Sequence, residues 1–199
     1  MIRPTPISLQ GDTVCLVPLG REHLDSLIEV GCDPDLWGIT VNDGSTPSAM
    51  AGWLETALAE QRRGTALAFA TTLRADGRVV GSTRFGNLDV KNQRVEIGWT
   101  FVAKAWQRSA VNTEAKYLML RHSFEVWRCL RVEFKTDALN AKSRTALLRL
   151  GAKEEGMLRK HTVTWTGRVR DTVYFSIVDD EWPTVRAQLE QKLARGDAS

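Results

Sequence analysis

The sequence lacks the features by which membrane, secreted and disulfide-stabilised proteins are usually recognised. No segment of the 199 residues approaches the roughly 18 consecutive apolar residues of a membrane span. The opening residues, MIRPTPISLQGD, have no apolar signal-peptide core. The three cysteines, Cys15, Cys32 and Cys129, include no CxxC pair and stand in apolar surroundings, which favours reduced, buried side chains. These absences predict a cytoplasmic protein without a membrane partner.

Blocks of one charge are also missing. The net charge is only +3, and Lys and Arg alternate with Asp and Glu along most of the chain. No basic patch of the kind that binds nucleic acid is therefore expected. The three histidines, His23, His122 and His161, share no metal-ligand spacing, so no metal site is expected either.

The chain has no internal repeat and no linker that would divide it. One domain over residues 1–199, with a core from about 10 to 185, is expected from this length and from the 43% hydrophobic content. Periodicity predicts an α/β (α+β) domain whose mixed, mostly antiparallel sheet of about seven strands is flanked by helices. The predicted strands are 13–19, 65–74, 78–89, 93–102, 129–137, 154–165 and 168–178. The predicted helices are 21–32, 48–63, 113–127, 141–151 and one starting near 181–183.

Glycine is absent from one junction where it would be useful. The stretch WQRSAVNTE, from Trp106 to Glu114, joins the predicted strand 93–102 to the predicted helix 113–127. Free amides and the dipole at a helix start suit a phosphate, and phosphate loops usually contain glycine. Asn112 or Thr113 is the expected N-cap of this helix. An ordinary capped helix without a ligand would explain the same spacing.

Two stretches, VEIGWTFVAKAWQRSAVNTEAKYLML and DALNAKSRTALLRLGAKEEG, resemble the GNAT superfamily of acetyl-CoA-dependent N-acyltransferases. The chain is similar to the branch that includes the ribosomal-protein N-terminal alanine acetyltransferases. Residues 107–112 correspond to the acetyl-CoA motif Gln/Arg-x-x-Gly-x-Gly/Ala, and Asn140 and Ser143 to the branch signature Asn-x-x-Ser. The chain departs from the first motif at Ala110 and Asn112. A left-handed backbone at an alanine would cost about 1 kcal/mol.

The resemblance implies a GNAT fold and acetyl-CoA as co-substrate. Amides of residues 107–112 would hold the pyrophosphate, and the splayed edge of strand 93–102 would pair with the pantetheine amides. Asn140 would contact the pantetheine arm or a water beside it. The residues implied in cofactor binding are Trp99, Thr100, Phe101, Val102, Gln107, Arg108, Ser109, Ala110, Val111, Asn112, Thr113, Asn140 and Ser143.

N-acyl transfer needs an amine that has lost its proton. Strand alternation over 93–102 predicts Val95, Ile97, Trp99 and Phe101 on one face and Arg94, Glu96, Gly98 and Thr100 on the other. Relatives often carry a glutamate on this strand as general base, which points to Glu96, acting directly or through water. The alternative is a surface glutamate paired with Arg94 or Arg84.

A general acid is harder to assign. The tyrosine that many superfamily members use is missing, since Leu147 occupies its position. In the similar branch the serine of Asn-x-x-Ser takes this role, here Ser143. That serine would equally serve as a helix cap, and a thiolate leaves without help.

The acceptor site is expected in the loop DPDLWGITVNDGSTPS (33–48), with Tyr174 closing the opposite wall. The candidate residues in the loop are Trp37, Asp35, Asn42 and Asp43. Acidic residues there would favour a cationic amine, or they are simply solvated. The resemblance thus predicts an N-acetyltransferase that acts on a primary amine of a small molecule or of a protein or peptide N-terminus by direct attack in a ternary complex. The alternatives are another acyl donor such as succinyl-CoA, and a non-catalytic CoA-binding module. A homodimer through exposed strand edges near the C-terminal hairpin is a further expectation.

Overall fold

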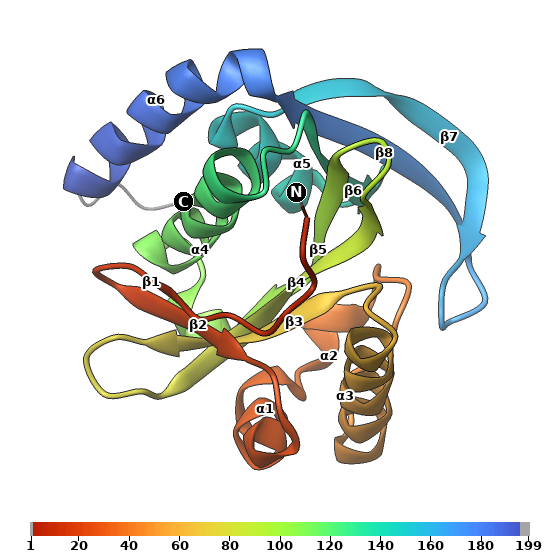
Figure 1. Cartoon of the computed structure of the whole chain (residues 1–199). Coiled ribbons are helices and arrows are strands. Elements are labelled where there is room, and N and C mark those ends of the chain that lie inside the picture. The colour runs from red at the N-terminus through yellow and green to blue at the C-terminus, as the bar shows by residue number, and fades with distance from the viewer. Residues whose placement is uncertain (1, 196–199) are drawn as a thin grey trace.

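One twisted sheet separates two layers of helices (Figure 1). The computed structural model describes residues 2–195. The strand order is β1-β2-β3-β4-β5-β6-β8-β7, and every neighbouring pair is antiparallel except β5 and β6. The strands are β1 (Leu9–Gln10), β2 (Val14–Pro18), β3 (Leu67–Leu73), β4 (Val79–Asp89), β5 (Arg94–Val102), β6 (Arg131–Asp137), β7 (Lys153–Val163) and β8 (Val169–Val178). The mixed, mostly antiparallel sheet is confirmed, with the two-residue β1 as an eighth strand.

The helices are α1 (Leu24–Gly31), α2 (Pro34–Trp37), α3 (Pro47–Arg62), α4 (Ala110–Arg121), α5 (Ala141–Leu150) and α6 (Trp182–Arg195). Helices α4, α5 and α6 pack on one face of the sheet, and α1 and α3 pack on the other (Figure 1). The short α2 lies inside the predicted loop 33–48. Its formation is explained by Asp33, whose side chain accepts the Asp35 amide, and by Pro34 at the first helical position.

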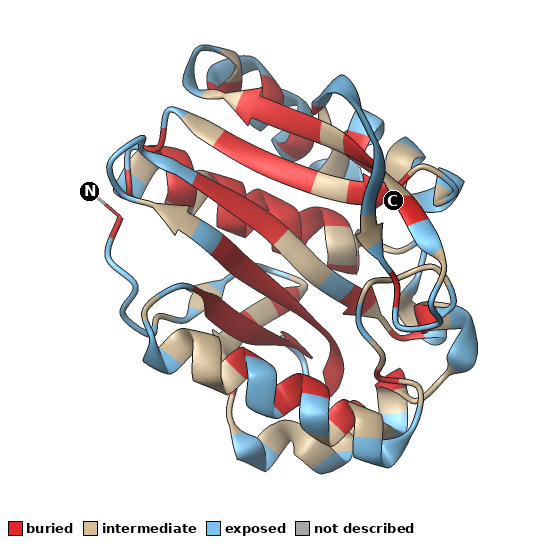
Figure 2. Ribbon diagram, turned by 90° about the vertical axis from the view of Figure 1, so that its right-hand side faces the viewer, coloured by how far each residue is buried: buried red, intermediate tan, exposed pale blue. Residues whose placement is uncertain are grey.

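Each face of the sheet has its own hydrophobic core, and buried residues run through the central strands (Figure 2). The core under α1 and α3 is built around Trp37, Trp53 and Phe101, whose ring centroids lie 5.3–6.2 Å apart. These large aromatic residues therefore serve as core fillers, and edge-to-face contacts add to the area they bury.

Strand β5 contains a β-bulge. Gly98 pairs with Arg84 and Phe101 pairs with Ser82, so two residues, Trp99 and Thr100, lie opposite a single residue of β4. Trp99 has a left-handed φ of 49°. An extra residue of this kind bends a strand and re-aims the side chains that follow it.

The bulge changes the faces predicted by alternation. Val95 and Ile97 belong to the core under α4, as expected on one face, whereas Phe101 belongs to the core under α1 and α3 and Trp99 packs against that same core. The expected placement of Trp99 and Phe101 beside Val95 and Ile97 is therefore wrong. Glu96 remains on the face opposite Val95 and Ile97.

Strands β5 and β6 diverge soon after they meet. Their parallel pairing covers only Arg94–Glu96 with Arg131–Glu133. From Ile97 to Val102, β5 keeps β4 as a neighbour but has no paired residue on β6. This leaves a fork in the sheet with a free backbone edge of β5 on one side.

Edge strand β7 is exposed along nearly its whole length. A dimer through this edge stays a prediction, as does the cytoplasmic location. Within residues 2–195 the structure has no helix that is both long and apolar enough to cross a membrane.

Candidate functional site

The loop between β5 and α4 forms one end of the fork. Helix α4 begins at Ala110, and Ser109 is its N-cap, accepting the Val111 amide at 3.3 Å while donating to the Trp106 carbonyl at 2.6 Å. The expectation that Asn112 or Thr113 caps this helix is wrong, because Ser109 already does so one turn earlier. The amides of Ala110 and Asn112 fall in the first turn, where no intrahelical acceptor exists.

The missing glycine has a structural explanation. Ala110 is the first helical residue, so its methyl group imposes no backbone cost. The left-handed conformation falls on Arg108, with a φ of 61°, and this side chain is exposed. The loop therefore places its strained position before the helix and keeps the helix-start amides free.

Arg108→Gly is expected to raise the free energy of unfolding by about 0.5–1 kcal/mol, because glycine adopts a left-handed φ without steric cost. Urea denaturation measures this change. Ala110→Gly is the control, since glycine brings no such relief at a helical position. If Ala110→Gly raised the free energy of unfolding and Arg108→Gly did not, the strain would lie at Ala110 and not at Arg108.

Two buried charged residues hold α4 in place. Glu114 accepts the amides of Asp12, Thr13 and Val14 at 2.9, 2.8 and 2.6 Å, which ties the helix start to the turn before β2. Two residues further along, Lys116 faces the bulge of β5.

Lys116 connects α4 to the bulge. It is only 6% exposed and donates to the hydroxyls of Thr83 at 3.1 Å and Thr100 at 2.5 Å. No carboxylate within residues 2–195 pairs with it. Burial lowers the pKa of Lys116 to about 7, because an isolated ammonium is costly in the protein interior.

Lys116→Met is expected to stabilise the protein near pH 7, with a gain that shrinks by about 2 kcal/mol by pH 9. The unfolded chain keeps the lysine proton up to its ordinary pKa of 10.5, whereas the folded chain loses it near pH 7. The wild-type free energy of unfolding therefore rises with pH between these values, and the methionine variant lacks this slope. Thr83 and Thr100 also bond each other, at 2.8 Å, and the variant is expected to keep this hydrogen bond.

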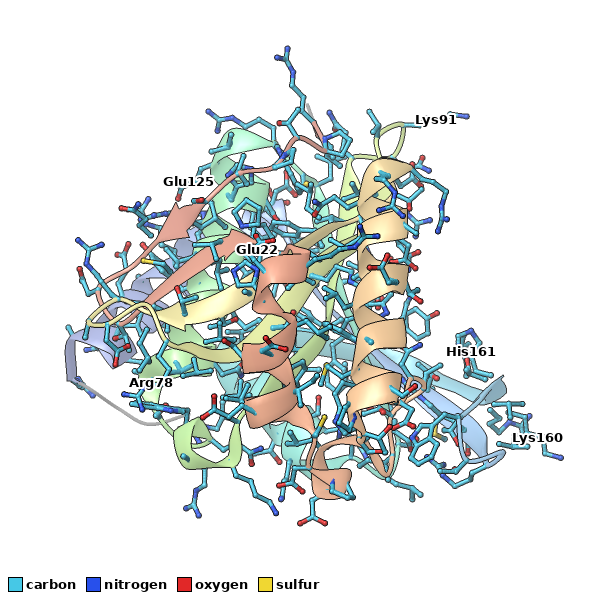
Figure 3. All side chains as sticks on the ribbon, turned by 90° about the horizontal axis from the view of Figure 1, so that it is seen from below. Glu22, Arg78, Lys91, Glu125, Lys160 and His161 are labelled. Carbon is cyan, nitrogen blue, oxygen red and sulfur yellow. The ribbon has the colours of Figure 1, made fainter. Side chains whose placement is uncertain are left out.

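The measurement is urea denaturation at several pH values between 6 and 9. Lys91→Met is the matched control, because Lys91 projects from the exposed β4–β5 turn (Figure 3). Parallel stability curves for wild type and Lys116→Met would mean that Lys116 stays charged when folded.

Glu96 lies at the apex of the fork, at the last position of β5 that pairs with β6. It is 6% exposed, and its Oε2 accepts hydrogen bonds from Lys135 Nζ and Asn87 Nδ2, both at 2.6 Å. The alternative of a surface glutamate paired with Arg94 or Arg84 is wrong, because both arginines pair with other carboxylates.

The second oxygen of Glu96 points toward Gly98. A side chain at position 98 would place its Cβ 3.3 Å from Oε1, so glycine keeps this oxygen accessible. Burial lowers the pKa of Lys135, but the hydrogen bond and charge of Glu96 outweigh it, so the pKa stands above its ordinary value. In this site Lys135 balances the charge of Glu96 through Oε2, while Oε1 of Glu96 stays accessible beside Gly98.

Two cavities are lined in part by residues of the strands next to Glu96, although Glu96 itself lines neither. The smaller, of about 360 Å³, is lined by Asp43 and Arg84 among others, and the larger, of about 810 Å³, by Lys135 and Tyr174 among others. Arg84 belongs to β4 and Lys135 to β6, the strands on either side of Glu96. The predicted acceptor residues Asp43 and Tyr174 are thus lining residues of different cavities.

The prediction for Trp37 is wrong. Its side chain is 4% exposed and its indole donates to the Gly31 carbonyl at 2.7 Å, so the ring belongs to the core. Instead Trp165, at the β7–β8 turn, donates to the Trp37 carbonyl at 2.9 Å and ties that hairpin to the loop. Figure 3 shows Lys160 and His161 projecting from the same hairpin beyond α3. The sequence signals only a turn there.

The sequence analysis named Arg84 only as a possible partner of Glu96, and the structure gives it a different environment. It is 2% exposed, its guanidinium lies 5.3 and 5.2 Å from the ring centroids of Trp53 and Trp99, and Nη1 bonds Glu60 at 2.5 Å. The available signal was that Arg84 is the one basic residue of β4.

The Asn-x-x-Ser motif, Asn140 to Ser143, lies at the start of α5. The Asn140 side chain accepts the Ser143 amide at 2.9 Å and is the N-cap. A capping role for Ser143 is therefore wrong, since Asn140 fills it. Within residues 2–195 no group of three His, Cys, Asp or Glu side chains would hold a metal ion.

Comparison with known proteins agrees with this geometry. Residues 13–153 match the family described as acetyltransferase (GNAT) domain. A Bacillus subtilis (strain 168) protein with the provisional name ribosomal N-acetyltransferase YdaF is 33% identical over 107 residues, which cover 54% of this chain and 57% of that protein. The alignment thus spans little more than half the length of this curated relative.

Solved structures cover more of the chain. A crystal structure from T. thermophilus, provisionally named an acetyltransferase, is 36% identical with a TM-score of 0.86 and covers 95% of this chain and 98% of its own. Mycobacterium smegmatis RimJ, solved with CoA-disulfide, shares the fold, with 23% identity, a TM-score of 0.81 and coverage of 100% and 99%.

Proposed function

This chain belongs to the acetyltransferase (GNAT) family, and we propose on that premise that it transfers the acetyl group of acetyl-CoA to a primary amine. The amine belongs to a small molecule or to a protein or peptide N-terminus and attacks directly in a ternary complex. The observation that carries the proposal is the fork between β5 and β6, with free helix-start amides at its mouth and buried Glu96 at its apex.

The fork suits the chemistry of acetyl-CoA. The edge of β5 from Ile97 to Val102 offers backbone groups to the amides of a pantetheine arm, in the manner of an added strand. The first-turn amides of α4 offer donors to a pyrophosphate. The CoA-disulfide in M. smegmatis RimJ supports the same cofactor here.

Glu96 takes the proton of the amine in this proposal. The nitrogen lone pair attacks the thioester carbonyl, the new N–C bond forms as the C–S bond breaks, and CoA leaves as a thiolate. Oε1 of Glu96 accepts the amine proton directly or through a water, while Lys135 and Asn87 hold Oε2. Ser143 is the candidate to return a proton to the thiolate, which is also a good leaving group unaided.

The smaller cavity is the proposed entrance for the amine. Asp43 and Glu60 supply two carboxylates there against the single guanidinium of Arg84. The Trp53 and Trp99 rings form its walls, and aromatic faces attract cations. An ammonium would be attracted to this entrance before it loses its proton.

The test has two independent readouts. Acetyl-CoA should raise the melting temperature, because binding to the folded state stabilises it. Thiol release from acetyl-CoA should then follow with at least one of a peptide N-terminus, a polyamine or an aminoglycoside. Binding without release for any amine would favour a non-catalytic CoA-binding module, and no binding at millimolar acetyl-CoA would overturn the proposal.

A further inference from the structure

A row of polar residues extends the site from β5 across β6 to β8. In β8, Arg170, Thr172 and Tyr174 alternate and so share one face of the sheet. The β6–β8 register places Tyr174 beside Lys135, whose ammonium lies 5.0 Å from the tyrosine ring centroid. Because Lys135 bonds Glu96, this row lies on the same face as the candidate base.

Two polar atoms in the row are buried without a partner. Arg170 is 8% exposed and Thr172 is 1% exposed. Neither Nε of Arg170 nor Oγ1 of Thr172 makes a hydrogen bond to any residue from 2 to 195. Most buried polar groups in native proteins are paired, so two unpaired donors at neighbouring positions of one face point to a ligand.

The charge of the row indicates the sign of that ligand. Asp137 forms an ion pair with Arg168, and its carboxylate lies 3.9 Å from Arg170 Nε, too far for a hydrogen bond. One carboxylate thus faces two guanidinium groups, while Glu96 is already compensated by Lys135. Around Asp137 the row therefore has one more cation than carboxylate, in a largely buried place.

We propose that Arg170 and Thr172 form a carboxylate-binding subsite for one of the two substrates, an inference that rests on the proposed function. A guanidinium N–H and a hydroxyl both donate to carboxylate oxygens, and such charge-assisted bonds are strong. The carboxylate belongs either to the distal end of a dicarboxylic acyl donor such as succinyl-CoA or to the amine acceptor. Both sources supply the same chemistry, and matched substrate pairs distinguish them.

The first pair compares succinyl-CoA with acetyl-CoA on one amine. The second compares amines that carry a carboxylate with their carboxamides, using acetyl-CoA as donor. Wild type should favour the carboxylate member of one pair at least 10-fold in kcat/KM. Arg170→Met should abolish that preference through KM, and Thr172→Val should reduce it about 3-fold, while Arg170→Lys should recover part of it. The exposed Arg159 of β7 provides the control Arg159→Met, which should change nothing.

Binding gives a readout that does not need turnover. Dissociation constants for the same compounds, measured by calorimetry, should show the same preference and the same loss in Arg170→Met. If no amine releases thiol, the proposed function fails, yet these constants still judge the subsite. Equal binding of carboxylate and carboxylate-free compounds by wild type would overturn the subsite. So would a preference that survives in folded Arg170→Met and Thr172→Val proteins.

Discussion

Glu96→Gln is expected to lower kcat/KM about 10²- to 10⁴-fold near pH 7, the range contributed by a positioned general base. Glutamine keeps the length of the side chain and an oxygen for Asn87, but it cannot accept the proton of an ammonium. The loss should appear in kcat, because the helix-start amides and the β5 edge that would hold acetyl-CoA are unchanged. Initial rates of thiol release measure the loss in kcat. The shift in melting temperature caused by acetyl-CoA checks that the variant is folded and still binds the cofactor.

The pH dependence of this loss separates base catalysis from a structural role. As the pH rises past the pKa of the acceptor, about 8 for an α-amine, solution supplies free amine without the base. The ratio of wild-type to Glu96→Gln rates should therefore shrink between pH 7 and pH 9.5. Glu133→Gln is the matched control, because Glu133 is the buried register partner of Glu96 on β6. A pH-independent ratio, or an equal loss in Glu133→Gln, would contradict the base assignment.

The sequence was sufficient to predict the order of the main elements and the placement of both motifs. Close hairpins and the strand–helix–strand crossover are local features, and they are expressed in turn residues and apolar periodicity. The loop 107–112 and Asn140 accordingly lie at the starts of α4 and α5, as expected. Glu96 was placed on the correct face for the same reason, because it precedes the bulge.

The bulge itself was not predictable from alternation. Trp99 and Thr100 suit a regular strand as well as an irregular one. What holds the extra residue in place is far away in the chain: Thr83 in β4 and Lys116 in α4. A lysine that reads as a surface residue of an amphipathic helix is in fact buried beside the fork, and only the tertiary structure reveals it.

The site residues that the sequence missed depend on contacts between distant segments in the same way. Lys135 follows Glu96 by 39 positions, and Trp165 is separated from Trp37 by 128. Trp37 was misassigned because a tryptophan in a turn-rich loop resembles a binding residue. In the structure, α2 turns its ring into the core under α1 and α3. Spacing along one strand or helix carries no information of this kind.

Glu114→Ala is expected to lower the free energy of unfolding by about 3–4 kcal/mol, because three amide donors lose a charged acceptor at a partly buried turn. Glu114→Gln should cost roughly half as much. The remaining side-chain oxygen of the glutamine still accepts the backbone amides of Thr13 and Val14. Its NH₂ group faces the backbone N–H of Asp12, so that hydrogen bond is lost.

The same substitution tests the link between this anchor and the phosphate-binding amides. Since Glu114 fixes the first turn of α4, Glu114→Ala should also raise the KM for acetyl-CoA more than it lowers kcat, in assays at a temperature where the variant stays folded. Urea denaturation and initial rates provide the two measurements. Glu29→Ala, on the exposed face of α1, is the control and should stay within about 0.5 kcal/mol of wild type. A loss below about 1 kcal/mol in Glu114→Ala would mean that the three amides find water instead, and that the start of α4 is held by Ser109 and core packing alone.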